Sequence, residues 1–175
     1  MKATIISNPQ ETMKKINLLN PKYGVTIQVC NALRIATWEH IFFSALYAML
    51  AFNQKRNISN QLALEILLYI SGQRQIKIAL KEFGIKTGNN IIIILGNSEE
   101  LVKEALIPCE KILGGVKANE IMSIVENFKL LAIQNYFQIN KAELNAIKLS
   151  VANESQENAI FKAVLNRIAL VALDK

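Results

Sequence analysis

The residues between Ser71 and Phe83 have the types and spacing expected of a contact with nucleic acid. Gly72 precedes a predicted helix over 73–83, and a helix N-terminus offers free backbone N–H groups and a positive dipole end to phosphates. Cationic side chains recur along one face of this helix, and two glutamines flank the first of them. The candidate residues are Gly72, Gln73, Arg74, Gln75, Lys77 and Lys81. The segment therefore predicts a nucleic-acid contact, although an ordinary amphipathic helix with solvated lysines has the same pattern.

A second chemically interesting pair, His40 and Ser44, lies one turn apart on a helix predicted to begin at Thr37. A histidine base must lie within about 3 Å of its nucleophile and needs a third group to orient it. Thirteen of the fourteen acidic residues are Glu, and the only Asp is Asp174. This composition excludes Asp-containing triads, EF-hands and kinase-type magnesium sites. We therefore expect no catalytic residues, and we keep a small-molecule enzyme or sensor with a pocket near Glu39 and His40 as an alternative.

Metal and cofactor sites are not expected either. Cys30 and Cys109 match no metal spacing, there is one histidine, and no GxGxxG, P-loop or CxxC motif occurs. The longest apolar run, Ile41–Phe52, is interrupted only by Ser44 and is shorter than the ~20 residues of a membrane-spanning helix. Because no signal peptide is evident, the sequence predicts a cytoplasmic protein that makes no membrane contact.

The elements that must position these residues are helices around a few short strands. The chain has 175 residues, of which 51% are hydrophobic and 19% charged, with a net charge of +6, and this predicts a single domain over residues 1–175. Predicted strands are Lys2–Ser7, Val25–Cys30 and Ile91–Leu95, the last an aliphatic run suited to burial on both faces. The expected class is α+β (α/β-like), with a small central sheet of about three to four strands covered by helices and a helix-rich C-terminal half.

Two predicted helices carry more apolar surface than a single buried face requires. The helix from Thr37 to about Lys55 has almost no polar face, and the last helix, from about Ser155, remains apolar as far as Leu173. A helix that is apolar all round is covered either by the core or by a partner.

One segment resembles a known protein family. Residues Glu65–Ile76, which read Glu-Ile-Leu-Leu-Tyr-Ile-Ser-Gly-Gln-Arg-Gln-Ile, are similar to the signature of the regulatory-subunit family of the KEOPS/EKC complex. The resemblance extends to the strand Val25–Cys30, the helix with Glu39-His40, Phe83-Gly84-Ile85 followed by the aliphatic strand Ile91–Gly96, and the apolar last helix. It is loose over 115–150. It implies a non-catalytic subunit of the complex that makes threonylcarbamoyladenosine in tRNA.

The resemblance also implies partners and sites. The family binds the small lobe of the atypical kinase/ATPase of the complex and stimulates it, and archaeal members help to recruit tRNA through its 3′ CCA end. A cofactor and a small-molecule substrate are not implied. The segment Gly72–Lys81 is then the expected tRNA contact, with Trp38 or Tyr69 as stacking groups; the alternative basic residues are Lys22, Arg34 and Arg56. A kinase adapter without RNA contact is a further alternative.

A kinase adapter should leave one apolar helical face uncovered in the isolated chain. We expect this face on the last helix around Ile160, Val164 and Leu165, together with part of the helix Ile41–Phe52.

Overall fold

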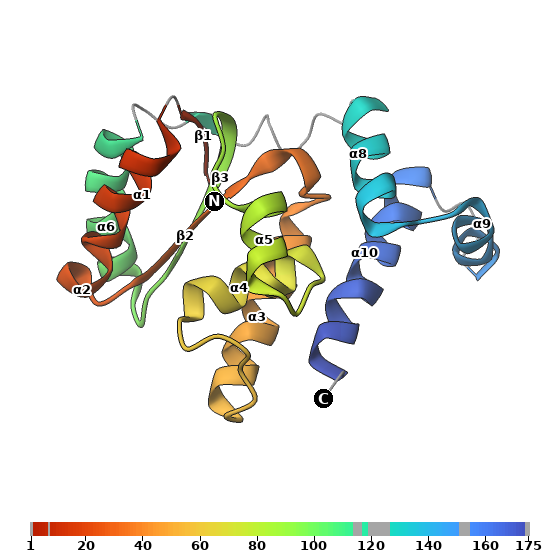
Figure 1. Cartoon of the computed structure of the whole chain (residues 1–175), viewed down its shortest axis with the longest axis horizontal. Coiled ribbons are helices and arrows are strands. Elements are labelled where there is room, and N and C mark those ends of the chain that lie inside the picture. The colour runs from red at the N-terminus through yellow and green to blue at the C-terminus, as the bar shows by residue number, and fades with distance from the viewer. Residues whose placement is uncertain (1, 7, 114–116, 119–126, 151–154, 174–175) are drawn as a thin grey trace.

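The computed structural model describes residues 2–6, 8–113, 117–118, 127–150 and 155–173, and its centre is an antiparallel sheet (Figure 1). The strands follow the order β2-β3-β1-β4 and are β1 (Lys2–Ile6), β2 (Thr26–Asn31), β3 (Gly88–Leu95) and β4 (Lys117–Ala118). The α+β class is confirmed. The α/β-like part of the expectation is wrong, because β3 lies between β1 and β2 and is antiparallel to both.

Helices lie on both sides of this sheet. Figure 1 shows one group to the left of the strands, α1 (Pro9–Asn17), α2 (Leu19–Tyr23) and α6 (Glu99–Ile112). A second group lies to the right, α3 (Trp38–Asn53), α4 (Leu62–Ser71) and α5 (Ile76–Phe83). Farther right are the C-terminal helices α8 (Asn127–Phe137), α9 (Lys141–Ser150) and α10 (Gln156–Leu173). Among the described residues, no helix combines the length and apolarity needed to span a membrane.

The aliphatic run of β3 joins two hydrophobic cores, as its sequence predicts. Side chains alternate along a strand, so Ile91 and Ile93 pack with α3, α4 and α10, whereas Ile92 packs with α1 and α6. All three isoleucines are buried. The sheet thereby fixes the position of α3 and α4, the two helices from which the candidate site is built.

Hydroxyl side chains cap two of the helices, and the first of them confirms the helix start predicted at Thr37. The Thr37 hydroxyl accepts the N–H of His40 and begins α3, and the Ser98 hydroxyl accepts the N–H of Leu101 and begins α6. Part of the C-terminal half, which the sequence predicts to be helix-rich, lies outside the described residues.

Candidate nucleic-acid interface

The candidate residues between Gly72 and Lys81, which we call the basic ridge, do not lie on one helix. Gly72 ends α4 in the left-handed conformation (φ 60°), which favours glycine. Its N–H donates to the Tyr69 carbonyl (3.0 Å), and the N–H of Gln73 donates to the Leu68 carbonyl (3.1 Å). The expectation of free amides at Gly72 is therefore wrong, because both amides close the C-terminus of α4.

The remaining ridge residues separate into two groups. Lys77 and Lys81 are exposed on α5, which begins only at Ile76. Arg74 lies before this helix, and its guanidinium donates to the Val171 carbonyl of α10 (2.9 Å). Arg74 therefore does not share a helix face with the two lysines.

The two glutamines of the ridge also have different surroundings. The side chain of Gln73 lowers the pKa of the Tyr136 hydroxyl, which donates to the Ser71 carbonyl (2.9 Å) and whose pKa burial raises. Gln75 is exposed at the N-cap of α5, where its side chain makes no capping bond. Neither glutamine lines the pocket between α3, α4 and α10, to which Arg74 contributes.

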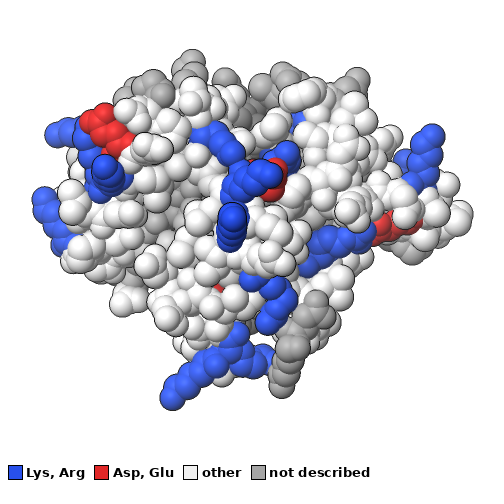
Figure 2. Space-filling model, in the orientation of Figure 1, with Lys and Arg blue, Asp and Glu red and all other residues white. Residues whose placement is uncertain are grey.

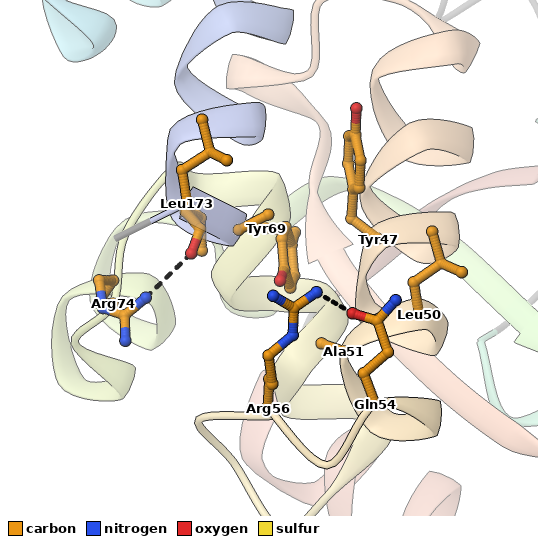
Figure 3. A pocket seen from close by; sticks show the side chains of 10 residues that line it. Tyr47, Leu50, Ala51, Gln54, Arg56, Tyr69, Arg74 and Leu173 are labelled. Carbon is orange, nitrogen blue, oxygen red and sulfur yellow. Dashed lines mark hydrogen bonds between the residues drawn. The ribbon is translucent and has the colours of Figure 1, made fainter. Parts of the chain in front are cut away.

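That pocket has a volume of about 480 Å³ and combines residues from distant parts of the sequence (Figure 3). It lies between α3, the loop that follows α3, α4 and the last turn of α10. Its described lining residues are Tyr47, Leu50, Ala51, Gln54, Arg56, Tyr69, Arg74, Val171, Ala172 and Leu173.

Two stacked tyrosines form the aromatic part of the pocket. The ring centroids of Tyr47 on α3 and Tyr69 on α4 lie 6.0 Å apart, with 22° between the ring planes. The pair is held in place because α3 and α4 pack against each other. Aromatic rings in such a site can stack on the bases of a single-stranded nucleic acid.

Two arginines supply positive charge beside these rings. Arg56 hydrogen-bonds the side chain of Gln54, and Figure 3 shows its guanidinium near the hydroxyl end of Tyr69. Burial raises the pKa of the Tyr69 hydroxyl, the Glu65 carboxylate raises that pKa further, and the charges of Arg74 and Arg56 oppose the rise. The phenol is therefore neutral at pH 7. Cations beside an aromatic surface can bind a phosphate and a base together.

The surface around the pocket is also basic. On the face seen in Figure 2, Lys and Arg side chains lie over α5 and at the lower end of the molecule, where the loop after α3 is found. Of the alternative basic residues, only Arg56 lines the pocket. Arg34 pairs with Glu82 (2.7 Å), and Lys22 lies over the ring of Tyr23 on α2.

Part of this pocket was predicted from the sequence. Arg74 was predicted as a site residue, Tyr69 as a stacking group and Arg56 as an alternative basic residue, whereas Tyr47 was not predicted. A tyrosine inside an apolar helix has no distinguishing spacing. The other stacking candidate, Trp38, lies edge-on to Phe42, outside the pocket.

The histidine of the enzyme alternative is buried and hydrogen-bonded at both nitrogens. Its Nδ1 accepts the N–H of Ala36 (3.2 Å), so Nε2 carries the proton that it donates to the Ile70 carbonyl (2.9 Å). Burial lowers the pKa of His40 to about 4. The Ser44 hydroxyl donates to the backbone carbonyl of His40, not to its ring. His40 therefore has no free nitrogen with which to act as a base on a substrate.

The C-terminal helix does not expose the apolar face that we expected. Ile160 and Val164 are 1% and 0% exposed and belong to the core, and Leu165 is half-buried. The expectation of an uncovered face at Ile160 and Val164 is wrong, because α3, α4, α8 and α9 all pack against α10.

An uncovered apolar face lies instead on the first half of α3. Trp38 and Phe42 are 56% and 51% exposed, at the mouth of an apolar groove of about 290 Å³. The described lining residues are Trp38, Ile41, Phe42, Ala45, Ile92, Ile93, Ile94, Leu95, Val102 and Leu106. Part of the predicted face on the helix Ile41–Phe52 is thus present in the structure.

Comparisons with known proteins identify relatives of this chain. A sequence model of the family described as kinase binding protein CGI-121 matches residues 4–172. The KEOPS complex subunit Cgi121 of Pyrococcus abyssi is 30% identical over 110 residues, which cover 56% of this chain and 60% of that protein. The regulatory protein Cgi121 of Methanocaldococcus jannaschii is 29% identical over 152 residues, which cover 87% of each chain.

Proposed function

The chain belongs to the family of the kinase binding protein CGI-121, and on that premise we propose that it is a non-catalytic subunit of a KEOPS complex. In this role it binds and stimulates the kinase/ATPase subunit and helps to recruit tRNA through its 3′ CCA end. The complex then makes threonylcarbamoyladenosine in the cytoplasm. Family membership and the names of the two relatives support the kinase partner.

The observation that carries the RNA contact is a pair of stacked tyrosines in a pocket that two arginines also line. A single-stranded 3′ end has unstacked bases and a charged backbone, and proteins bind such ends by stacking and phosphate contacts. Tyr47 and Tyr69 supply the stacking surface, and Arg56 and Arg74 supply the charge. A concave site with few cations fits a chain end better than it fits a duplex backbone.

The kinase contact is proposed on the first half of α3. The groove beside Trp38 and Phe42 is apolar, and both side chains are more than half exposed. Large exposed apolar surfaces with such a groove are typical of protein interfaces. The RNA pocket uses the other half of the same helix, through Tyr47, Leu50 and Ala51. The two partners therefore occupy different surfaces and can be bound at the same time.

The RNA proposal is tested by binding full-length tRNA and the same tRNA without its CCA end over a series of salt concentrations. We expect tight binding that requires the CCA end and has a shallow salt dependence, because each phosphate contact to a single strand contributes a slope of about −0.7. Equal binding of both tRNAs with a steep slope contradicts a 3′-end pocket. Absence of binding removes RNA from the function and leaves the kinase adapter.

A further inference from the structure

Glu65 is a buried carboxylate whose partners belong to a loop. Its side chain is on α4, and the residue is 0% exposed. Oε2 accepts the N–H of Ile58 (3.0 Å) and the N–H of Ser59 (2.7 Å), and Oε1 lies 3.2 Å from the same Ile58 nitrogen. A buried charge is costly unless hydrogen bonds compensate it, and these charge-assisted bonds to backbone amides do so. The carboxylate thereby ties the loop after α3 to α4.

The same loop brings Arg56 to the RNA pocket. At the end of α3, Lys55 adopts the left-handed conformation (φ 55°), and the N–H of Arg56 donates to the Ala51 carbonyl (2.8 Å). These contacts fix the loop just before Arg56. The bonds from Ile58 and Ser59 to Glu65 fix it just after Arg56. Arg56 is therefore held between two anchors, of which only the second depends on a side chain.

Glu65 also lies one helical turn before a stacking residue of the pocket. Tyr69 follows it by four positions on α4, so the two side chains lie on the same face of the helix. The Glu65 carboxylate and the Arg56 guanidinium both act on the pKa of the Tyr69 hydroxyl. Figure 3 shows the Arg56 guanidinium near the hydroxyl end of Tyr69. The helix that carries Tyr69 is thus also the helix that anchors Arg56.

We infer that Glu65 is a positioning residue of the RNA pocket: its carboxylate holds the loop that places Arg56 beside Tyr69, so that cation and ring together contact the RNA. The inference rests on the proposed function, because it concerns the same pocket. Glu65 itself is buried and touches no RNA. Its effect on RNA binding passes through Arg56.

A double-mutant cycle separates this role from a general effect on stability. RNA affinity is measured for the wild type, Glu65→Gln, Arg56→Ala and the double variant, using tRNA with an intact CCA end. We expect Arg56→Ala to weaken binding roughly tenfold, the effect of losing one charge-assisted contact. Glu65→Gln alone should also weaken binding. In the double variant Glu65→Gln should add nothing, because Arg56 is already absent.

The salt dependence provides a readout that stability alone does not move. Both single variants should show a smaller salt slope than the wild type, since each loses the phosphate contact of Arg56. Glu143→Gln is the matched control, because Glu143 is a largely buried carboxylate that pairs with Arg167 and does not line the pocket. It should leave RNA affinity and salt slope unchanged. Glu65→Asp, which keeps the charge, replaces Glu65→Gln if the latter fails to fold.

The possible results distinguish the inference from the function on which it rests. If the wild type binds tRNA but the two substitutions weaken binding additively, the positioning role is wrong and the RNA pocket stands. The same holds if Glu65→Gln changes neither affinity nor slope. If the wild type does not bind tRNA, the proposed RNA function is wrong, and the inference is wrong with it.

Discussion

The Arg74 guanidinium donates a hydrogen bond of 2.9 Å to the carbonyl of Val171, which is 97 positions away in the sequence. Carbonyls in the last turn of a helix lack partners within the helix, and a cation there also interacts favourably with the negative end of the helix dipole. Arg74 therefore closes the C-terminus of α10. Arg74 and Val171 both line the RNA pocket, so this hydrogen bond also holds one wall of the pocket in place.

Replacing Arg74 should therefore change both stability and RNA binding. We expect Arg74→Ala to lower the free energy of unfolding by about 1–2 kcal/mol, the effect of one charge-assisted hydrogen bond, and to weaken RNA binding. Chemical denaturation and tRNA titration measure the two effects. Lys77→Ala, an exposed neighbour on α5, is the control and should leave stability nearly unchanged. Equal stability of Arg74→Ala and the wild type would contradict the role of this bond.

The stacked tyrosines predict a dependence on rings rather than on hydroxyls. Tyr47→Leu should weaken tRNA binding by about 1–3 kcal/mol, the range found for one base stacked on an aromatic ring. Tyr47→Phe should retain most of the affinity because it retains the ring. Tyr23→Leu changes a tyrosine of α2, outside the pocket, and serves as the control in the same titration. A loss with Tyr47→Phe as large as that with Tyr47→Leu would argue against stacking.

Two substitutions to Glu distinguish the core from the proposed kinase surface. Val164→Glu places a charge at a fully buried site, which costs several kcal/mol, and we expect loss of the folded circular dichroism signal. Phe42→Glu changes a half-exposed side chain at the groove and should keep the folded signal. It should abolish co-purification with the kinase subunit. A folded Phe42→Glu variant that still binds the kinase would place the kinase contact elsewhere.

The burial of His40 predicts a pH dependence with a definite sign. Because the pKa of His40 falls from 6.5 to about 4 on folding, the unfolded chain takes up a proton between these values and the folded chain does not. The contribution of His40 to the free energy of unfolding should be fully present above pH 6.5. It should be lost as the pH falls toward 4, which lowers the free energy of unfolding by about 3 kcal/mol. His40 is the only histidine, so its NMR ring signals report it directly. A midpoint near 6.5 in the folded protein would contradict this burial.

Local sequence determined the elements and much of the fold class. The aliphatic run Ile91–Leu95 predicts a strand that is covered on both faces, and it forms the last five residues of β3, in which Ile91, Ile92 and Ile93 are buried. Thr37 caps the helix that it was predicted to begin, and Ser98 caps α6 in the same way. These signals are local, because a hydroxyl bonds an amide three residues away and side chains alternate along a strand.

The segment Glu65–Ile76 shows where local reasoning stops. Arg74 was predicted to share one face of a helix over 73–83 with Lys77 and Lys81, yet this helix begins only at Ile76 and Arg74 bonds the Val171 carbonyl of α10. The role of Glu65 could not be predicted from the pattern of charges along the chain, because its partners are backbone amides of a loop.

Only the tertiary structure decided what forms the pocket and which apolar faces stay uncovered. Tyr47, Tyr69 and Arg74 meet because α3, α4 and α10 pack together, and that same packing buries Val164 while Phe42 remains exposed. Periodicity along one helix shows that a side is apolar. It does not show which neighbour covers that side, because the covering atoms belong to segments that approach only when the whole chain has folded.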